Sequence, residues 1–527
     1  MRQTVGEALV TLLEAQGVDL VFGIPGVHTV ELYRGLDASN IRHVTPRHEQ
    51  GAGFMADGYA RVTGRPGVCF LITGPGLTNA ITAMGQARAD SIPMLVVSSV
   101  NPANTIGRAL GQLHELPQQT ELSETVAVAT YRLEEPEQLV GFIEDAFKKM
   151  VIERPGPIHI EIPTDVLGMT FDLTSANPVK CIKREPSTAD LEAVVRHLEE
   201  SEKVLVIAGG GCAFEGEAVR RLAEKLDAPT VTTINARGVM KGHRLEVPAS
   251  PAMISVRKLI SEADCVLALG TEIADTDYDM FGTGPFPDID RIIRVDIDPA
   301  QFEKRDDEGL MIHADVGLFV ESIIDRLAPK FGNGDKWAED GRKFAKQELS
   351  ETYLNHIDLV HTLWKAFPNA RIVGDSTQLI YAANMYVEAP ASRLWFNSAT
   401  GFGTLGYSVS AAIGAALAEP TRDTFCLVGD GGLQFTLSEL GTAFDTNVNV
   451  AYLVWNNNGY GEILSAMERA DVAPVGVSPS APDFVKIAEA YGLSTKRVQD
   501  RESLIEALKE LPRPCLIDMT VPEDGCI

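Results

Sequence analysis

The segments FCLVGDGGLQF (425–435) and VAYLVWNNNGY (450–460) decide the fold of this 527-residue chain. Each starts as an apolar, β-rich run and then breaks at a polar residue, Asp430 in the first segment and Asn457 in the second. Polar groups that follow neighbouring parallel strands meet at one edge of the sheet, where open α/β sheets bind ligands. Carboxylate and amide oxygens are ligands that Mg²⁺ accepts together with phosphate oxygens. The two segments therefore predict a parallel α/β sheet with a site for Mg²⁺ and a phosphorylated ligand.

Gly431 and Gly432 directly follow Asp430. Because they lack a Cβ, backbone N–H groups at the start of the next helix can approach an anion closely. The same GDG motif also fits an ordinary turn beside a surface asparagine. The motif alone does not separate the two interpretations.

The pattern of these two segments recurs along the whole chain. Short apolar runs alternate with amphipathic helical stretches such as 49–62, which indicates parallel sheets covered by helices. The runs are VFGIPG (21–26), VCFLIT (68–73), MLVVSSV (94–100), PIHIEI (157–162), VLVIAGGG (204–211), CVLALG (265–270), IIRVDID (292–298) and RIVGD (371–375). A polar, proline-containing stretch after residue 170 and a charged, glycine-containing stretch near 330–345 interrupt the alternation. We therefore expect three α/β domains, over residues 1–170, 187–330 and 346–527.

The composition excludes two classes of function. Lys and Arg total 46 against 73 Asp and Glu, a net charge of −27 that repels nucleic-acid phosphates and anionic lipid surfaces. The 7 cysteines are widely spaced, form no CxxC pair and are expected to be reduced thiols. No run approaches the roughly 18 apolar residues of a membrane span. We expect a cytoplasmic globular protein that binds neither nucleic acid nor membranes.

The two segments quoted first, together with five other motifs, resemble the thiamin diphosphate-dependent 2-oxo acid enzymes. The resemblance is to the acetolactate synthase and benzoylformate decarboxylase branch, and it covers the whole chain in the family's order and spacing. The other motifs are FGIPG (22–26), RHEQGAGFMADGYAR (47–61), TGPGLTN (73–79), VDIDP (295–299) and GTLGYSVSAAIGA (403–415). The resemblance implies the thiamin diphosphate-binding fold, with three Rossmann-like domains that bind the pyrimidine, form the middle and bind the diphosphate.

The resemblance also assigns roles to residues around the GDG motif. Asp430, Asn457 and the backbone carbonyl of Gly459 are expected to hold Mg²⁺ against the cofactor's diphosphate. Gly431 and Gly432 are expected to lie against the diphosphate itself.

Four further residues of the third domain are implied cofactor contacts. Thr377 and Gln378 lie where diphosphate contacts are expected. Leu405 occupies the bulky apolar position that bends the cofactor into a V, and backbone groups near Gly403 should meet its aminopyrimidine ring.

Glu49 is the first catalytic candidate, because the family uses the glutamate of this motif to hydrogen-bond a pyrimidine nitrogen of the cofactor. That contact favours the imino tautomer, which removes the proton from thiazolium C2. Apolar neighbours such as Phe54 and Met55 on the same helix could raise the pKa of Glu49, as burial does for other catalytic carboxylates. Outside this motif, a structural carboxylate facing the helix dipole would be the preferred interpretation.

Two histidines are candidates for proton transfer. Leu113-His114-Glu115 stands where acetolactate synthases carry Phe-Gln-Glu, so an imidazole replaces an amide near the expected reaction centre. A histidine with an ordinary pKa of about 6.5 can donate the proton that releases an aldehyde, and an amide cannot. His28 lies one residue after the position of a catalytic aspartate in pyruvate decarboxylase, a position that Val27 fills here. A loop or capping role for His114 and a structural role for His28 remain open.

The middle domain carries the substrate candidates Glu272, Asp275 and Asp277. They belong to GTEIADTD (270–277), which stands where acetolactate synthases have an Arg-Phe-Asp-Asp-Arg flavin motif. Both arginines are missing, so FAD is not expected. Asp277 aligns near a pocket histidine of benzoylformate decarboxylase, and three carboxylates there suit a cationic substrate tail. A solvated acidic loop is the alternative in so acidic a chain.

Four segments narrow the expected substrate. GIPGVHT (23–29), SSVN (98–101), LHE (113–115) and GTEIADTD (270–277) together resemble the 2-ketoarginine (5-guanidino-2-oxopentanoate) decarboxylases. We therefore expect non-oxidative decarboxylation of 2-ketoarginine to 4-guanidinobutanal and CO₂, with thiamin diphosphate and Mg²⁺. Two alternatives stay open: an acetolactate synthase-like carboligase that condenses 2-oxo acids, and a catalytically silent cofactor-binding relative. The family builds its site between subunits, which implies at least a homodimer, with a homotetramer as the expected assembly.

Overall fold

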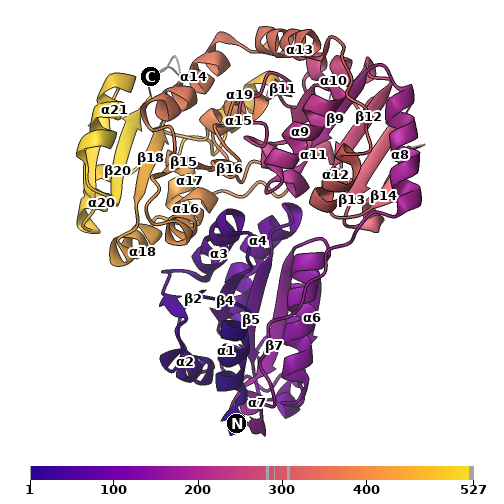
Figure 1. Cartoon of the computed structure of the whole chain (residues 1–527). Coiled ribbons are helices and arrows are strands. Elements are labelled where there is room, and N and C mark those ends of the chain that lie inside the picture. Colours follow the sequence, from indigo (N-terminus) through magenta and orange to yellow (C-terminus); the bar gives the residue numbers. More distant parts are fainter. Residues whose placement is uncertain (1, 280–283, 290, 306–308, 522–527) are drawn as a thin grey trace.

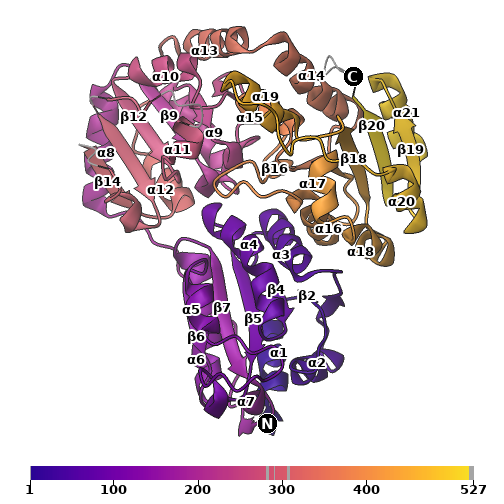
Figure 2. The same cartoon turned by 180° about the vertical axis from the view of Figure 1, so that it is seen from behind.

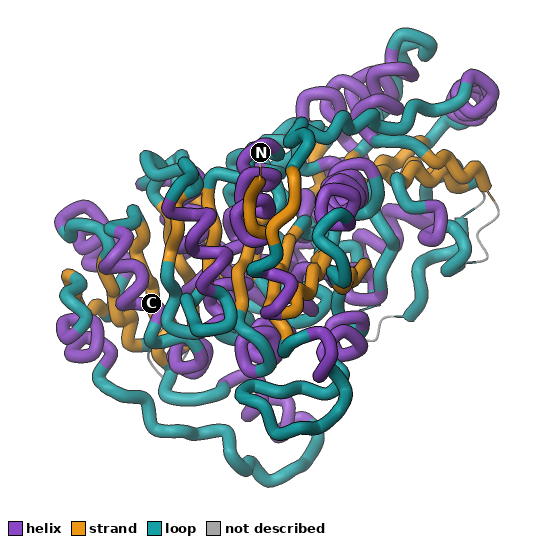
Figure 3. The backbone as a smooth tube through the Cα atoms, turned by 90° about the horizontal axis from the view of Figure 1, so that it is seen from below, coloured by secondary structure: helices purple, strands orange, loops and turns teal. Residues whose placement is uncertain are grey.

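The computed structural model describes residues 2–279, 284–289, 291–305 and 309–521, and it consists of three α/β units (Figure 1). Each unit has one six-stranded sheet, and neighbouring strands in all three sheets are parallel. Figure 3 shows the strands of the sheets lying between layers of helices. The expected fold class, three parallel-sheet α/β units, is confirmed.

The N-terminal unit has the strand order β3-β2-β4-β5-β7-β6. Its strands are β2 (Leu20–Gly23), β3 (Arg42–Val44), β4 (Gly67–Leu71), β5 (Met94–Val100), β6 (Ala129–Arg132) and β7 (Pro157–Pro163). Its helices are α1 (Val5–Ala15), α2 (Val30–Asp37), α3 (Glu49–Thr63), α4 (Pro75–Ala89), α5 (Gln119–Glu124), α6 (Gln138–Ile152) and α7 (Thr164–Leu167). A short antiparallel ribbon joins β1 (Arg2–Thr4) to β8 (Thr170–Asp172). Every residue of β4, β5 and β7 is buried, as expected for strands covered on both faces.

The middle unit has the strand order β11-β10-β9-β12-β13-β14. Its strands are β9 (Val204–Ala208), β10 (Thr230–Thr232), β11 (Glu246–Val247), β12 (Cys265–Leu269), β13 (Ile292–Asp296) and β14 (Gly309–His313). Its helices are α8 (Thr188–Glu200), α9 (Gly216–Leu226), α10 (Ile254–Ser261), α11 (Asp275–Tyr278) and α12 (Val316–Ile324). The strand order changes direction between β9 and β12, and a crevice at such a point is where doubly wound sheets bind ligands.

The C-terminal unit has the strand order β16-β15-β17-β18-β20-β19. Its strands are β15 (Arg371–Gly374), β16 (Trp395–Asn397), β17 (Thr424–Gly429), β18 (Val450–Asn456), β19 (Ser494–Val498) and β20 (Cys515–Thr520). Its helices are α15 (Gln378–Met385), α16 (Tyr407–Ala418), α17 (Asp430–Phe435), α18 (Glu439–Thr446), α19 (Gly461–Arg469), α20 (Phe484–Ala490) and α21 (Arg501–Glu510). Two helices, α13 (Gly334–Glu348) and α14 (Glu351–Ala366), connect it to the middle unit.

The N-terminal and C-terminal units share one hydrophobic core, in which α3 crosses α16. Figures 1 and 2 show the two helices side by side from opposite directions. Two glycines allow their backbones to touch: a Cβ at Gly58 would lie 2.0 Å from the Ala411 carbonyl oxygen, and one at Gly414 would lie 1.9 Å from that of Met55. Helix α3, which contains most of the RHEQGAGFMADGYAR motif, therefore packs directly against the C-terminal unit.

Two composition-based expectations concern the covalent state and membranes. The six cysteines of the described residues carry free thiols, and Cys526 lies outside those residues. In the described part of the chain, no helix has both the length and the apolar surface that crossing a bilayer requires.

Candidate functional site

One cluster of the expected residues lies at the carboxyl ends of β15, β17 and β18. Gln378 is the first residue of α15, Asp430 is the first residue of α17, and Asn457 directly follows β18. The Asn457 side-chain oxygen lies 3.1 Å from Asp430 Oδ1 and 2.8 Å from the Gly459 carbonyl oxygen. The sequence-based grouping of Asp430, Asn457 and Gly459 thus corresponds to three oxygens that face one another.

The direction of the Asn457 amide follows from its neighbours. The indole N–H of Trp455, which can only donate, lies 3.2 Å from Gln378 Oε1. Gln378 Oε1 therefore acts as an acceptor, and Asn457 Nδ2 donates to the same oxygen at 3.0 Å. This leaves the Asn457 oxygen facing Asp430 and Gly459. Turning the amide over would form two hydrogen bonds there, but would set its oxygen against an acceptor at Gln378.

A bound cation would resolve the crowding of these oxygens. Adjacent ligands of an octahedral Mg²⁺ at about 2.1 Å lie about 3 Å apart, which matches the two separations. Asp430 is 3% exposed, and burial raises the pKa of its carboxyl to about 6 although backbone N–H groups lower it. A carboxylate, an amide oxygen and a carbonyl oxygen form a hard donor set that fits Mg²⁺. Among the described residues, no group of three or more His, Cys, Asp and Glu side chains offers another metal site.

Glycines let the backbone approach this cluster closely. A Cβ at Gly431 would lie 2.5 Å from the Tyr460 ring, and one at Gly432 would lie 2.9 Å from Asp375 Oδ1. Larger residues therefore do not fit at either position without a shift. Beside Asp430 the chain therefore exposes backbone groups rather than side chains, which suits the expected contact with a diphosphate.

Asp375, which sequence reasoning did not single out, connects the segments of this cluster. Its buried carboxylate accepts hydrogen bonds from the backbone N–H groups of Ser376, Gly406 and Ser408, at 3.0 to 3.1 Å, and from the Ser408 hydroxyl at 3.2 Å. It thereby ties the segment before Gln378 to the loop that carries Leu405. Burial raises the pKa of Asp375 to about 6, whereas these donors lower it. The feature of the sequence that could have identified Asp375 is its position at the end of the apolar run RIVGD.

The remaining expected cofactor contacts lie close to Asp375 in the sequence or in the fold. Thr377 occupies the position directly before α15 without a side-chain capping hydrogen bond, and a Cβ at Gly429 would lie 3.0 Å from Thr377 Oγ1. Gly403 is exposed with a φ of +70°, and Leu405 is half-buried beside it. The Thr404 backbone N–H and hydroxyl between them donate to Gln86 Oε1 of the N-terminal unit, at 3.2 and 2.9 Å.

A second cluster lies at the carboxyl ends of strands in the N-terminal unit. Glu49, the first residue of α3, is half-buried and accepts a hydrogen bond from Asn79 Nδ2 at 2.9 Å. Asn79, the last residue of the TGPGLTN motif, was not singled out from the sequence. The imidazoles of His28 and His114 meet edge to face, with ring centroids 5.5 Å apart. The structure thus brings together the two histidines that were selected separately.

The position of His114 depends on Gly74. His114 has a φ of +59°, and a Cβ at Gly74 would lie 2.3 Å from its carbonyl oxygen. The Gly74 N–H donates to Gln119 Oε1 at 2.8 Å, and this hydrogen bond fixes the backbone of Gly74. The Nδ1 atoms of both histidines are buried, and no described residue hydrogen-bonds to them. Burial, and to a smaller extent the charge of His114, lower the pKa of His28.

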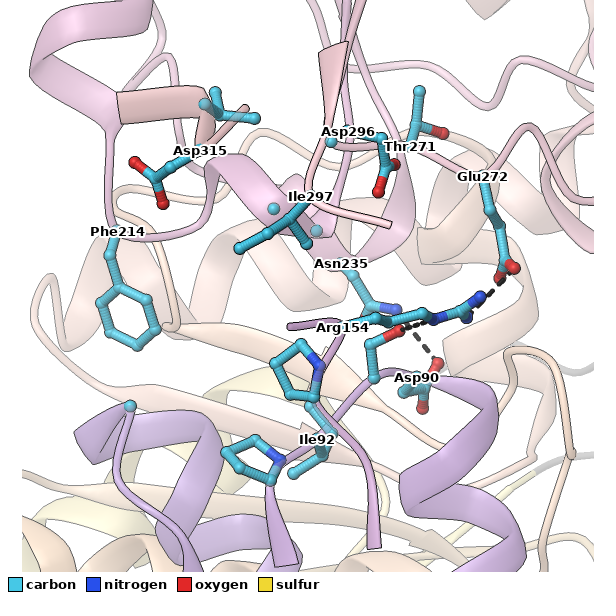
Figure 4. Close-up of a pocket in the computed structure, with 18 of the residues that line it drawn as sticks. Asp90, Ile92, Arg154, Phe214, Asn235, Thr271, Glu272, Asp296, Ile297 and Asp315 are labelled. Atoms are coloured by element: carbon cyan, nitrogen blue, oxygen red, sulfur yellow. Dashed lines mark hydrogen bonds and ion pairs between the residues drawn. The ribbon is translucent and has the colours of Figure 1, made fainter. Parts of the chain in front are cut away.

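The three acidic substrate candidates belong to the middle unit and differ in their surroundings. Glu272 lines a cavity of about 350 Å³ between the N-terminal and middle units, where it pairs with Arg154 at 3.1 Å (Figure 4) and with Lys304 at 3.4 Å. Asp275 is exposed. Glu272 is thus already neutralised, and Asp275 faces water.

Asp277 is the candidate without a counter-ion. It lines the same cavity as Glu272 and also a smaller pocket beside Thr400 and Gly401, and no described residue forms an ion pair with it. Burial raises the pKa of Asp277 to about 7, and the charge of Arg237 opposes that shift. Thr400 and Gly401 lead into the loop of Gly403 and Leu405. Asp277 therefore lies next to the segment that is expected to contact the cofactor.

The two clusters remain separate within one chain. Neither hydrogen bonds nor ion pairs connect the cluster of His28, Glu49 and His114 with that of Asp430 and Asn457 in the described ranges. Each cluster is half of the arrangement that the motifs imply.

Comparisons with known proteins agree with this geometry. Models of thiamine pyrophosphate enzymes match the chain in three parts: the N-terminal TPP binding domain at residues 3–123, the central domain at 191–323 and the C-terminal TPP binding domain at 375–519. The probable 2-ketoarginine decarboxylase AruI of Pseudomonas aeruginosa is 42% identical over 96% of this chain and 91% of that protein. The large subunit of acetolactate synthase isozyme 1 of Escherichia coli is 32% identical over 99% of this chain and 94% of that protein.

A solved structure shows the same fold. The thiamine diphosphate-dependent 4-hydroxybenzoylformate decarboxylase of Rhodococcus jostii RHA1 superposes with a TM-score of 0.85, covers 99% of this chain and 100% of that one, and is 23% identical. The expected resemblance and the expected cofactor, thiamin diphosphate, are confirmed by the three domain matches. The chain therefore belongs to the thiamine pyrophosphate-dependent enzymes, in the group that contains 2-oxo acid decarboxylases and acetolactate synthases.

Proposed function

We propose that this enzyme decarboxylates a cationic 2-oxo acid without oxidation, with 2-ketoarginine as the first candidate, and that it requires Mg²⁺. The single observation that carries the substrate is Asp277, a half-buried carboxylate that forms no ion pair with a described residue and lies beside Thr400 and Gly401. A guanidinium would supply the missing counter-ion through paired, charge-assisted hydrogen bonds. The name of the 42% identical relative points to the same substrate.

The C-terminal cluster is proposed to hold the cofactor. Asp430 Oδ1, the Asn457 oxygen and the Gly459 carbonyl would bind Mg²⁺, and Gln378 would keep the Asn457 amide in the binding direction. Thr377 and the Gly431–Gly432 backbone would contact the diphosphate, and Leu405 would support the bent form of the cofactor. When bound, thiamin diphosphate supplies a nucleophilic carbon and an electron sink for the loss of CO₂.

The N-terminal cluster is proposed to move protons. Glu49 would hold a proton at a pyrimidine nitrogen of the cofactor, with Asn79 fixing the position of its carboxyl group. For each CO₂ that is released, one proton must be added to the carbon that becomes the aldehyde. His114 would donate this proton, and His28, whose pKa is lowered, would stay neutral beside it. An imidazole at position 114 favours aldehyde release over condensation with a second 2-oxo acid.

The smallest active species is proposed to be a homodimer, with a homotetramer as the full assembly. Glu49 of one chain would act on cofactor held by Asp430 and Asn457 of the other. Exposed apolar side chains next to both clusters support a second chain packed on this surface. Val27 is 71% and Leu113 60% exposed beside the histidines, and Phe435 and Ile463 are each 53% exposed near Asp430 and Asn457.

Product analysis tests the proposed reaction. The enzyme with thiamin diphosphate and Mg²⁺ is incubated with 2-ketoarginine and, separately, with pyruvate. We expect CO₂ and 4-guanidinobutanal from 2-ketoarginine and little turnover of pyruvate. Acetolactate from pyruvate without 4-guanidinobutanal would identify a carboligase instead, and no turnover of either acid would identify a silent cofactor-binding relative.

A further inference from the structure

Glu439 crosses from the C-terminal unit to the start of the catalytic helix. It is the first residue of α18, and its side chain is fully buried. The carboxylate accepts hydrogen bonds from the backbone N–H of Arg47, at 3.0 and 3.1 Å, and from that of His48 at 3.0 Å. These are the two residues that directly precede Glu49. In Figures 1 and 2, α18 lies beside α16 on the side that faces the N-terminal unit.

Residues of both α18 and α3 lie close to the Glu439 carboxylate. The Thr442 hydroxyl, one turn further along α18, donates to Glu439 Oε2 at 2.6 Å. On the other side, a Cβ at Gly51 would lie 2.4 Å from Glu439 Oε1, so only glycine fits in the first turn of α3 at that point. The carboxylate therefore touches α3 on both sides of Glu49.

Burying a carboxylate costs desolvation free energy, so a buried carboxylate at this place calls for a positional role. Burial raises the pKa of Glu439 to about 7, whereas the Thr442, Arg47 and His48 donors lower it. An apolar residue of similar size could fill a buried space between two units without this desolvation cost. A carboxylate, however, fixes two adjacent N–H groups in one direction. These N–H groups lie outside the α-helical hydrogen bonds that hold the rest of α3.

We propose that Glu439 is a positioning residue for Glu49. By holding the Arg47 and His48 N–H groups, it sets where α3 begins and therefore the point from which Glu49 reaches the cofactor. This inference rests on the proposed role of Glu49. It adds that the cofactor-binding unit of a chain, through α18, places the glutamate that the same chain contributes to catalysis.

The test uses Glu439→Gln, which keeps the size of the side chain but replaces one acceptor oxygen by an NH₂ group. The Arg47 N–H lies 3.0 and 3.1 Å from the two carboxylate oxygens, so in either orientation of the amide it faces the NH₂ group on one side, and we expect the first turn of α3 to shift. Small misplacements of catalytic groups cost on the order of 100-fold in rate. With thiamin diphosphate and Mg²⁺ bound, we expect C2-proton exchange and kcat to fall about 10- to 100-fold, while KM and cofactor Kd change less than about threefold.

Asp445→Asn is the matched control. Asp445 lies on the same helix and pairs with the Arg47 side chain at 2.6 Å, but its side chain is 56% exposed. Exposed ion pairs contribute little, so this variant should behave as the wild type in every assay. Equal losses in both variants would show a general weakening of the contact between the units, and would overturn the inference.

Two further measurements keep the inference testable. Amide hydrogen exchange of residues 47–52 in the cofactor-free protein should be faster in Glu439→Gln than in the wild type. If Glu439→Gln does not fold, Thr442→Val removes the hydroxyl that orients the carboxylate, and C2-proton exchange should fall about threefold. Wild-type rates of C2-proton exchange in the folded variants would overturn the inference. A wild-type enzyme that does not accelerate this exchange would instead overturn the proposed role of Glu49, while the amide exchange still tests the contact.

Discussion

At the residue scale, the proposed metal site depends on a neutral neighbour. Trp455 fixes Gln378 Oε1 as an acceptor, and Gln378 in turn keeps the Asn457 oxygen toward Asp430. Without Gln378, the amide could turn over and donate to Asp430 and Gly459 instead. Through this hydrogen bond, Gln378 would control whether the Asn457 oxygen is available to Mg²⁺ at the proposed site.

This arrangement predicts the effect of Gln378→Leu. Loss of an orienting partner typically weakens metal binding about 10- to 100-fold, so the Mg²⁺ needed for half-maximal cofactor binding should rise by that factor. Titration of cofactor-induced changes in tryptophan fluorescence with Mg²⁺ measures it. Gln347→Leu, on the exposed face of α13, serves as the control and should change the value less than threefold. An unchanged Mg²⁺ requirement in Gln378→Leu would show that something else orients Asn457.

Asp277→Asn tests the substrate at the residue scale. A charge-assisted pair with a guanidinium contributes roughly 1.5 to 3 kcal/mol, so kcat/KM for 2-ketoarginine should fall about 10- to 100-fold. The value for 2-oxohexanoate, which has an uncharged tail, should stay within about threefold of the wild type. Asp275→Asn is the control, because Asp275 is exposed. Equal effects on both substrates would remove the argument for a cationic tail.

The raised pKa of Asp277 also predicts how stability depends on pH. The folded-state pKa of about 7 exceeds the ordinary value of 3.8, with burial as the main cause, Arg237 opposing it, and Glu272 and Asp90 adding to it. The folded protein then binds the proton more tightly than the unfolded chain, so the contribution is full below about pH 4 and disappears as pH rises through 7. Relative to Asp277→Asn, the wild type should lose about 1.4 kcal/mol per pH unit in this range, or about 3 kcal/mol between pH 5 and pH 7. Thermal unfolding of both proteins from pH 5 to pH 8 measures this, and parallel curves would contradict it.

At the element scale, the crossing of α3 and α16 positions the catalytic helix. Gly414→Ala places a Cβ 1.9 Å from the Met55 carbonyl oxygen, so the two helices must separate. Overpacking of this kind costs about 1 to 3 kcal/mol, and we expect a lower Tm together with slower C2-proton exchange. Gly141→Ala is the matched control: Gly141 lies inside α6 with no atom within 4 Å of the added Cβ. That change should raise stability by about 0.5 to 1 kcal/mol. A Gly414→Ala protein as stable as the wild type would show that the crossing tolerates a wider separation.

The sequence predicts those parts of the site that depend on one element at a time. Asp430 and Asn457 follow strands that are mostly apolar, so their place at the carboxyl ends of the strands could be predicted from the apolar runs. Contacts between elements were not readable: Glu439 and His48 are far apart in the chain and meet only because α16 packs on α3. The pairing of His28 with His114 likewise depends on the backbone of Gly74 and on a φ of +59° at His114. Neither feature has a periodic signal.

At the scale of the whole molecule, the proposed function divides one chemical task between the two clusters. The C-terminal unit presents the oxygens proposed to bind Mg²⁺, whereas the N-terminal unit presents Glu49 and the histidines. The two units are locked to each other by a common core, so closure of one chain on itself would have to break that core. In the proposed homodimer, two copies related by twofold symmetry would complete two sites at once, since each chain would give one cluster and receive the other.

Mixed dimers test this arrangement directly. Glu49→Gln and Asp430→Ala should each be inactive as pure proteins. In a heterodimer of the two, one site combines both defects, while the other combines an intact Glu49 with an intact Asp430. Co-expression with two different affinity tags and purification of the doubly tagged species should therefore recover about half of the wild-type activity per dimer, as twofold symmetry requires. Sedimentation of the same sample shows whether these dimers associate further into tetramers. If both residues acted within a single chain, every site in the heterodimer would be defective, and the purified species would be as inactive as its parents.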